Sequence, residues 1–281
     1  MEVITPADLT EAVKYMNQHL DTKVLAGGTD LLVKWKEGKV KLDRVLNVQG
    51  LQELRYIREE NGYLLLGALN THGEIAAAEA VWEHAPMLAE ACAQVGSAQI
   101  RNRGTLGGNL VTASPAGDTL PALNVLGATV NLISSRGERR VPVGEFFLGP
   151  GQTSLQPGEL VAGIAIPIFK AGETGFYKKL GQRKALAIAV VSVAVKLKLS
   201  AGVIESIRIA CGSVGPKVVE LPETAAKLMG CSLDERELWE KTGGAGEETS
   251  PISDIRASRE YRQEMVRALL YQGLYDLKNK E

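Results

Sequence analysis

The sequence has few cysteines, and their arrangement excludes several kinds of site. Among 281 residues there are three, Cys92, Cys211 and Cys231, which lie far apart and form no Cys-x-x-Cys pair. An odd, scattered set predicts neither a disulfide framework nor a cysteine-ligated zinc or iron–sulfur centre within this chain. We therefore expect buried, reduced thiols and a cytoplasmic protein without a metal site of its own.

The sequence also has no excess of one charge, few aromatic side chains and no long apolar run. Lys and Arg total 32 against 33 Asp and Glu, and aromatic residues make up only 5% of the chain. This composition argues against nucleic-acid binding through bulk charge or base stacking. The best candidate for a membrane span, 185–195, is too short, and the N-terminus shows no signal peptide. Neither a nucleic acid nor a membrane is expected as a partner.

Familiar phosphate-binding motifs and catalytic side-chain sets are also absent. Neither GxGxxG nor GxxxxGK occurs, and no Ser/His/Asp, Cys/His or paired-carboxylate set is recognisable. The three histidines, His19, His72 and His84, lie in polar, helix-like contexts and are interpreted as surface or capping residues. No catalytic residue is expected, and any chemistry would come from a bound cofactor.

The chain does contain an ordered succession of elements. Periodicity predicts an αβαβ unit in about the first 50 residues, later a hairpin over 129–143 and a strand over 160–166. A polar break at 171–175 precedes three strand-like runs and a long closing helix over 259–277, and alternation in the second run predicts one solvated face. We expect an α+β protein with domains 1–171 and 172–281, the second with an antiparallel sheet and helices.

Glycine is abundant, at 30 residues, and two glycine loops stand out. The first, Ala-Gly-Gly-Thr-Asp at 26–30, follows a predicted strand and precedes a predicted helix. The second, at 103–109, lies in a polar segment, 97–118, that shows no helical or strand period. Each loop offers backbone N–H groups unobstructed by side chains, and together they suit a pyrophosphate. That both loops are merely tight turns remains an alternative, as does a simple capping role for Asp118 behind them.

The two loops carry a resemblance to a known family. The runs AGGTDLL at 26–32 and IRNRGTLGGNL at 100–110 resemble the signatures of the FAD-binding medium subunit of the xanthine dehydrogenase and carbon monoxide dehydrogenase family. The resemblance covers essentially the whole chain, including the run 111–118 and the segment 210–214. It implies an FAD-binding domain of the vanillyl-alcohol-oxidase (PCMH) type followed by a small α+β domain.

The resemblance also implies a function and partners. Such a subunit passes electrons from iron–sulfur clusters of a partner through FAD to an acceptor such as NAD. The implied hetero-oligomer contains a small subunit with [2Fe-2S] clusters and a large molybdopterin subunit. Two alternatives remain open: a stand-alone PCMH-type flavin oxidoreductase, and a non-catalytic scaffold whose glycine loops are only turns.

Residue by residue, the resemblance implies a set of FAD contacts. The first loop would wrap the pyrophosphate, with Thr29 donating its hydroxyl, and the second would add backbone donors. Val111 and Thr112 would lie against the isoalloxazine, Asp118 would bind a hydroxyl of the cofactor, and Lys179 would lie near the flavin. The full implied set is Val24, Leu25, Ala26, Gly27, Gly28, Thr29, Asp30, Leu31, Thr105, Leu106, Gly107, Gly108, Asn109, Val111, Thr112, Asp118, Val161 and Lys179.

Two further points concern the surroundings of this site. Ala187 stands where the family often has Asp, which affects the mouth of the flavin site. In the second loop, Ile100 and Leu106 alternate with Arg101 and Arg103, a composition typical of an interface core. The alternative is that the two apolar residues face the core and the arginines anchor phosphate.

Overall fold

The computed structural model describes residues 1–183 and 188–278. Its N-terminal part is a small parallel sheet with two helices. The strands are β1 (Glu2–Ile4), β2 (Lys23–Leu25) and β3 (Arg44–Asn47), in the order β1-β3-β2. Helix α1 (Leu9–Gln18) buries Ala12 and Met16 against this sheet, whereas α2 (Leu31–Lys36) buries none of its residues.

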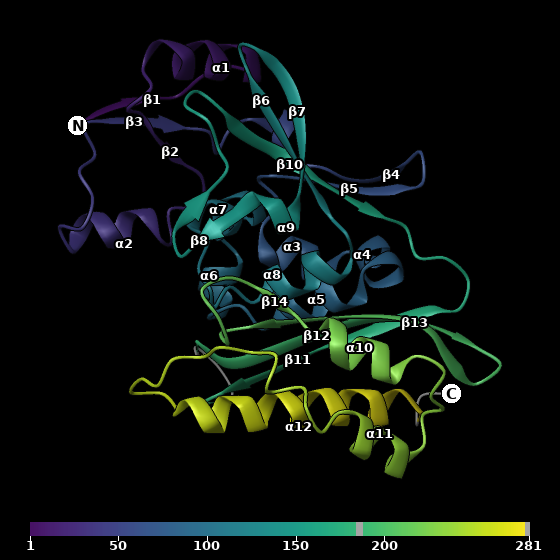
Figure 1. Ribbon diagram of the computed structural model, residues 1–281. Coiled ribbons are helices and arrows are strands. Elements are labelled where there is room, and N and C mark those ends of the chain that lie inside the picture. Colours follow the sequence, from purple (N-terminus) through teal and green to yellow (C-terminus); the bar gives the residue numbers. More distant parts are fainter. Residues whose placement is uncertain (184–187, 279–281) are drawn as a thin grey trace.

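The middle of the chain forms a five-stranded antiparallel sheet and most of the helices (Figure 1). The sheet order is β4 (Ile57–Glu60), β5 (Tyr63–Gly67), β10 (Leu160–Pro167), β6 (Thr129–Ser134), β7 (Gly137–Pro142). The helices are η1 (Gln52–Leu54), α3 (His72–Ala77), α4 (Glu79–His84), α5 (Pro86–Ala93), α6 (Ala98–Arg101), α7 (Leu106–Thr112), α8 (Thr119–Val125) and α9 (Val143–Phe146). A short ribbon of β8 (Phe147–Gly149) and β9 (Gln152–Thr153) follows α9.

The C-terminal part is a four-stranded antiparallel sheet whose strands follow one another in sequence order. They are β11 (Glu173–Gly181), β12 (Ala189–Ser200), β13 (Val203–Gly212) and β14 (Val219–Glu220). Three helices accompany it: α10 (Pro222–Leu228), α11 (Glu235–Lys241) and the long α12 (Arg259–Lys278). Within the described ranges, no helix is both long and apolar enough to cross a bilayer.

Both faces of this C-terminal sheet are covered. Helix α12 packs on one face, and helices α5 and α8 of the middle part of the chain pack on the other. Val193 and Val195 of β12 join the core beneath α12, whereas Ala194 joins the core formed with α5 and α8. The expectation of one solvated face is therefore wrong for the first half of β12. The small side chain of Ala194 belongs to a second buried face there, and β12 reaches solvent only in its second half, from Lys196 onward.

Strand β11 is an edge strand, and α5 lies along it. The backbone N–H of Tyr177 donates to the Glu90 carboxylate of α5 at 2.8 Å. The predicted boundary between residues 171 and 172 lies in the connection from β10 to β11, and the exact division into domains stays a prediction.

Candidate functional site

The two glycine loops meet in the folded chain. The backbone at Gly27 approaches Arg103 so closely that a Cβ on Gly27 would overlap the Arg103 carbonyl oxygen. Thr29 faces the same crossing, since a Cβ on Gly104 would lie 3.3 Å from its Oγ1 atom. Glycine alone permits such an approach of two backbones. The structure thus brings together the loop after β2 and the segment before α7.

The first loop carries unused backbone donors. Within the described residues, the N–H groups from Gly27 to Leu31 form no hydrogen bond. At its end, the Asp30 carboxylate accepts a long hydrogen bond from Thr112 Oγ1 at 3.4 Å and pairs with Lys34 at 2.7 Å. Successive free N–H groups of this kind make an anion-binding concavity. The loop therefore has the donors that a pyrophosphate requires.

The second loop differs, because it belongs to a short helix. Thr105 caps α7 by accepting a hydrogen bond from the Gly108 N–H at 3.2 Å. Three further amides of the loop donate to main-chain carbonyls: Leu106 to Asn70, Gly107 to Ala68 and Asn109 to Thr105. The prediction that 97–118 has no regular structure is wrong, because paired glycines obscured the helical periodicity of α7. The amides of residues 106–109 are already engaged, so this part of the loop offers a smooth surface rather than a second set of free donors.

The two glycines of α7 face different surroundings. A Cβ on Gly107 would lie 2.8 Å from the Ala68 Cβ and 2.9 Å from the Ala68 carbonyl oxygen. A Cβ on Gly108 would meet only Thr105 Oγ1, at 3.0 Å. Gly107 is therefore a packing position against the backbone, whereas at Gly108 a Cβ would crowd only the hydroxyl that caps α7.

Asp118 and Lys179 form a buried ion pair between α8 and β11. Lys179 Nζ lies 2.8 Å from one Asp118 oxygen and also donates to the Gln94 carbonyl oxygen at 3.0 Å. The Tyr177 hydroxyl donates to the other Asp118 oxygen at 3.0 Å. Burial raises the pKa of the Asp118 carboxyl, although the Lys179 ammonium opposes this shift. Asp118 precedes α8 but its side chain does not cap it, so the simple capping role is wrong.

His72 is buried at the second loop. Its exposed fraction is 2%, and its Nδ1 lies 3.6 Å from the Cys92 sulfur. Burial, with a smaller contribution from the Arg101 charge, lowers the pKa of His72 to about 4. The interpretation of this residue as a surface group is therefore wrong. Burial and the positive charge of Arg101 both disfavour protonation of the ring, which is therefore neutral at pH 7.

The remaining predicted contacts differ in exposure. Val24 and Val111 are exposed at the surface, whereas Val161 is buried in β10. Asn109 of α7 accepts a hydrogen bond from the Thr119 hydroxyl at 2.5 Å, which fixes α7 to α8. Ala187, at the position where the family often has Asp, lies outside the described residues.

A cavity of about 580 Å³ borders the crossing of the two loops. Three predicted residues, Ala26, Gly27 and Thr105, contribute to its wall, and Asp118 and Lys179 do not. The other lining residues are Gln49, Arg55, Leu69, Thr71, Gly73, Glu74, Ala77, Asn102 and Arg103. The predicted contacts therefore fall into two groups, one at this cavity and one around the Asp118–Lys179 pair.

The partner interface expected at the second loop stays a prediction, but Leu106 cannot contribute a surface contact to it. Leu106 is fully buried and faces the core. Arg101 donates to the carbonyl oxygens of Val95 and Gly96, and Arg103 donates to Gln49 at 3.2 Å. Both arginines thus make hydrogen bonds within this chain. The burial of Leu106 agrees with the alternative that it faces the core.

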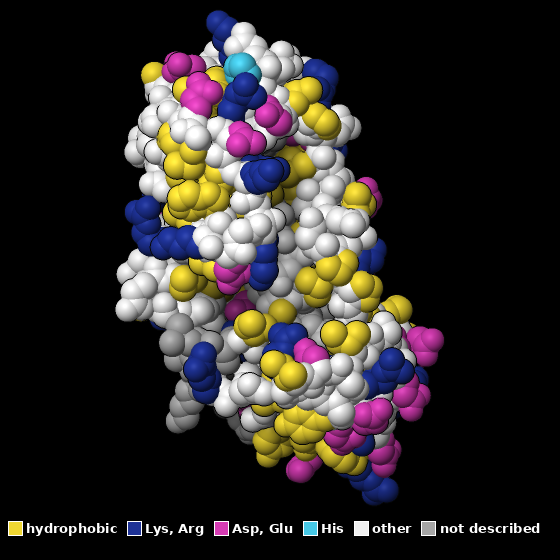
Figure 2. Space-filling model, turned by 90° about the vertical axis from the view of Figure 1, so that its left-hand side faces the viewer, with side chains coloured by type: hydrophobic (Ala, Val, Ile, Leu, Met, Phe, Trp, Pro, Cys, Tyr) yellow, Lys and Arg dark blue, Asp and Glu magenta, His cyan; other side chains and the backbone are white. Residues whose placement is uncertain are grey.

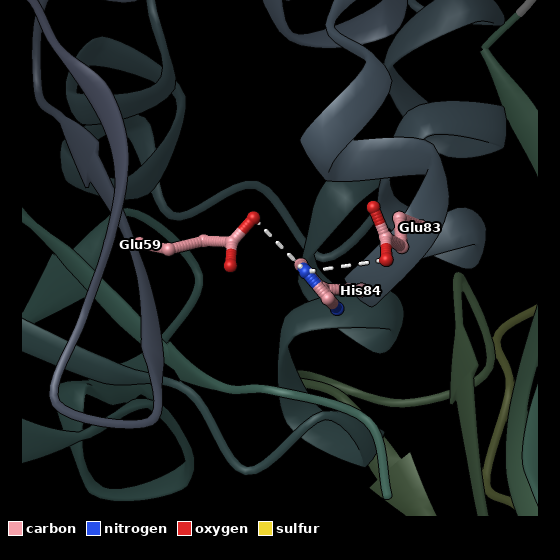
Figure 3. A group of neighbouring side chains, drawn as sticks. All are labelled: Glu59, Glu83 and His84. Carbon is pink, nitrogen blue, oxygen red and sulfur yellow. Dashed lines mark ion pairs between the residues drawn. The ribbon is translucent and has the colours of Figure 1, made fainter. Parts of the chain in front are cut away.

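One further cluster brings three potential metal ligands together. Figure 3 shows Glu59 of β4 and Glu83 of α4 on either side of His84. His84 Nε2 lies 3.1 Å from Glu59 and 4.0 Å from Glu83, and both carboxylates are about half exposed or more. His84 itself is only 12% exposed, so the two carboxylates reach it from the solvent side.

Tyr177, Gln94 and Glu90 had not been predicted near the site. They surround β11 and the Asp118–Lys179 pair through the contacts described above. No motif marks them, because two of the three contacts use backbone atoms, which any residue type provides.

Comparison with known proteins agrees with this architecture. Residues 1–169 match the family described as the FAD binding domain in molybdopterin dehydrogenase, and residues 176–277 match the CO dehydrogenase flavoprotein C-terminal domain. The glyceraldehyde dehydrogenase medium chain of Sulfolobus acidocaldarius is 34% identical over 261 residues, covering 93% of this chain and 92% of that one. The carbon monoxide dehydrogenase medium chain of Hydrogenophaga pseudoflava is 30% identical and covers 97% and 95%.

Solved structures show the same fold. A chain of Cu,Mo-CO dehydrogenase superposes with a TM-score of 0.94 at 28% identity, covering 100% of this chain and 98% of that one. A chain of quinoline 2-oxidoreductase from Pseudomonas putida 86 gives a TM-score of 0.93 at 29% identity, with coverage of 98% and 96%. From its two domains and its full-length relatives, the chain belongs to the FAD-binding medium subunits of the molybdenum hydroxylase family.

Proposed function

We propose that this chain passes electrons from the [2Fe-2S] clusters of a small subunit through FAD to an acceptor such as NAD, while a large molybdopterin subunit oxidises the substrate. FAD supplies the redox chemistry, because it can exchange electrons with both a cluster and a soluble acceptor. The chain's own residues bind and orient it. We place the complex in the cytoplasm, where the three buried, unpaired thiols of this chain would stay reduced.

The observation that carries the cofactor site is the crossing of the loops at Gly27. The close approach of Gly27 to Arg103 and the free N–H groups up to Leu31 fit a pyrophosphate bound by backbone donors. No lysine is needed, which suits a chain with a net charge of −1. In this arrangement the first loop donates hydrogen bonds, and Gly108 provides the adjoining surface.

The flavin end is assigned to the second group of residues. The Asp118 carboxylate keeps lone pairs beside those used by Tyr177 and Lys179, and these can accept from a hydroxyl of the cofactor. Burial raises the pKa of the Asp118 carboxyl, and the Lys179 ammonium at 2.8 Å opposes this rise. Val111 and Thr112 would supply the surface against the isoalloxazine, and Val161 a contact in β10.

Two of the chain's three histidines, His72 and His84, are engaged within the protein and do not suit acid–base work on a substrate. His72 is neutral and enclosed beside Cys92, and His84 pairs with Glu59 at the surface. Substrate oxidation is therefore assigned to another subunit. The names of the relatives, which are medium chains or FAD subunits of dehydrogenases, support this division of labour.

Co-expression with the other two subunits tests the proposal. A purified complex should contain FAD together with iron and molybdenum, and the isolated chain should contain FAD without turning over a purine, an aldehyde or carbon monoxide. Stopped-flow mixing of the FAD-loaded chain with NADH should bleach the flavin if NAD is the acceptor. Turnover by the isolated chain would instead favour a stand-alone flavin oxidoreductase, and a chain without flavin would favour a scaffold.

A further inference from the structure

Strand β11 turns two polar side chains toward the same carboxylate. Successive side chains of a strand point to opposite faces of its sheet, so Tyr177 and Lys179 share one face of β11. The opposite face carries Lys178, which pairs with Asp276 of α12. On the first face, the Tyr177 hydroxyl and the Lys179 ammonium both reach Asp118, at the start of α8. Helices α5 and α8 lie on that side of the sheet and α12 on the other (Figure 1).

The two donors bind different oxygens of the carboxylate. The Tyr177 hydroxyl oxygen lies 3.0 Å from Asp118 Oδ1, and Lys179 Nζ lies 2.8 Å from Asp118 Oδ2. The Cβ–Cγ torsion of an aspartate has a broad energy minimum, so a single donor leaves the carboxylate free to turn. A donor on each oxygen fixes its plane, and with it the direction of the lone pairs that stay unused. Tyr177 therefore adds orientation to the charge pairing that Lys179 provides.

Tyr177 is itself held firmly. Its backbone N–H donates to Glu90 of α5 at 2.8 Å, and it pairs with Ala194 in the ladder between β11 and β12. The residue is only 3% exposed. Burial, with a smaller contribution from the Asp118 charge, raises the pKa of the Tyr177 hydroxyl well above its ordinary value. The hydroxyl therefore keeps its proton and remains a donor.

These buried contacts bridge the two parts of the chain. Tyr177 and Lys179 belong to the C-terminal sheet, whereas Asp118 belongs to the part that carries the glycine loops. On the face shown in Figure 2, acidic and basic side chains also lie together where the upper and the lower part of the molecule meet. Charged groups in contact with solvent interact weakly, whereas hydrogen bonds to a buried carboxylate are among the stronger ones. The C-terminal sheet thus determines the orientation of an acceptor in the other part of the chain.

We propose that Tyr177 is a positioning residue for FAD: its hydroxyl holds the Asp118 carboxylate in the orientation that accepts a hydrogen bond from a hydroxyl of the cofactor. The proposal rests on the proposed function, in which Asp118 binds FAD. Tyr177 acts through Asp118, because its hydroxyl proton is donated to that carboxylate. The alternative is a purely structural contact, in which the two residues only hold β11 against α8.

Titration of the FAD-free, full-length chain with FAD tests the proposal, since quenching of flavin fluorescence gives a Kd. Tyr177→Phe keeps the buried ring and removes only the hydroxyl, and it should raise this Kd by about 10-fold. In an Asp118→Asn chain, which has lost the carboxylate, adding Tyr177→Phe should change the Kd by less than about 2-fold. The matched control is Tyr15→Phe, because the Tyr15 hydroxyl is buried without a hydrogen-bond partner among the described residues. This control should leave the Kd unchanged.

Coupling of the two substitutions in the Kd, with an unchanged control, is the expected result. At saturating FAD, the flavin circular dichroism of Tyr177→Phe should also differ from that of the wild-type chain, because the cofactor hydroxyl meets a differently oriented carboxylate. An unchanged Kd in a folded Tyr177→Phe protein, or independent effects of the two substitutions, would overturn the proposal and leave a structural contact.

Two further outcomes are distinguishable from these. If Asp118→Asn does not fold, the effect of Tyr177→Phe is measured in the Lys179→Met/Asp118→Asn chain, which removes both charges of the pair. Loss of FAD from Asp118→Asn but not from Tyr177→Phe would refute the positioning role and leave the proposed function intact. A wild-type chain that binds no FAD would contradict the proposed function itself, and the positioning role with it.

Discussion

Asp118 and Lys179 lie 2.8 Å apart in space although 61 residues separate them in the chain. Both side chains are less than one-tenth exposed, and their ion pair connects α8 with β11, the first strand of the C-terminal sheet. One contact therefore joins the two parts of the chain at the place where we assign the flavin. The packing of α8 against β11 therefore depends in part on the Asp118 carboxyl group.

Removing Lys179 should be costly. Lys179→Met leaves Asp118 buried without its counter-ion, and we expect a loss of about 3 kcal/mol in the free energy of unfolding. The adjacent Lys178 pairs with Asp276 near the surface, so Lys178→Met should cost less than about 1 kcal/mol. Urea unfolding of the two variants measures the difference. Adding Asp118→Asn to Lys179→Met should recover part of the loss, and simple additivity of the two substitutions would contradict the coupling.

The two glycines of α7 should respond differently to valine. In Gly108→Val the new Cβ would lie 3.0 Å from Thr105 Oγ1, a single hydroxyl that can shift, so the protein should fold and yet lose FAD. Gly107→Val pushes a side chain into Ala68 and should lower stability by about 1–3 kcal/mol or more. The flavin-to-protein absorbance ratio and thermal unfolding separate these effects. Stoichiometric FAD in a well-folded Gly108→Val protein would contradict the assignment of this surface.

The loop crossing can be tested with one methyl group. In Gly27→Ala the new Cβ would overlap the Arg103 carbonyl oxygen, so the loops must separate. We expect FAD to be lost and stability to fall by about 1–3 kcal/mol. Gly50→Ala is the control, because a Cβ there meets nothing within 4 Å. Equal FAD content in the two variants, measured after gel filtration, would show that the crossing is not needed for binding.

Because His72 is buried, we expect the protein to lose stability in mild acid. Its pKa is lowered to about 4 in the folded chain from an ordinary value of 6.5, so the contribution of the neutral ring is complete above pH 6.5 and declines as the pH falls toward 4. Between pH 7 and pH 5 the free energy of unfolding should fall by about 2 kcal/mol from this group. Urea titrations at the two pH values measure it. His72→Leu should remove this dependence, whereas His19→Asn, at the end of α1, should retain it.

The order of helices and strands could be predicted from the sequence, because it depends on hydrophobic periodicity and turn residues that lie close together in the chain. The strand–loop–helix order around 24–36 and the hairpin over 129–142 appear in the structure close to their expected positions. Helix α7 was missed because Gly107 and Gly108 lower helix propensity, and the Thr105 cap compensates only once the chain folds.

Side-chain surroundings were predicted less well, because they depend on contacts across the chain. Asp118 has the sequence position of a helix cap, but its carboxylate binds Tyr177 and Lys179 of β11. His72 lies in a polar run and is nevertheless buried against Cys92. For Leu106 the sequence left two positions open, because an apolar residue beside arginines suits both a surface patch and a core position. Only its packing in the folded chain distinguishes the two.

The contact between Glu90 and Tyr177 bears on aggregation. The free edge of a sheet is a template for pairing with another chain, and β11 is such an edge. Helix α5 protects this edge. Its Glu90 accepts a hydrogen bond from the Tyr177 N–H, and its Met87 packs against Gly175. The edge of the C-terminal sheet is thus protected by α5, a helix from the preceding part of the chain. Because α5 is synthesised before β11, it is already present when this strand forms. A fragment consisting of 172–281 alone would keep its own core but leave this edge open, and it should associate with itself edge to edge.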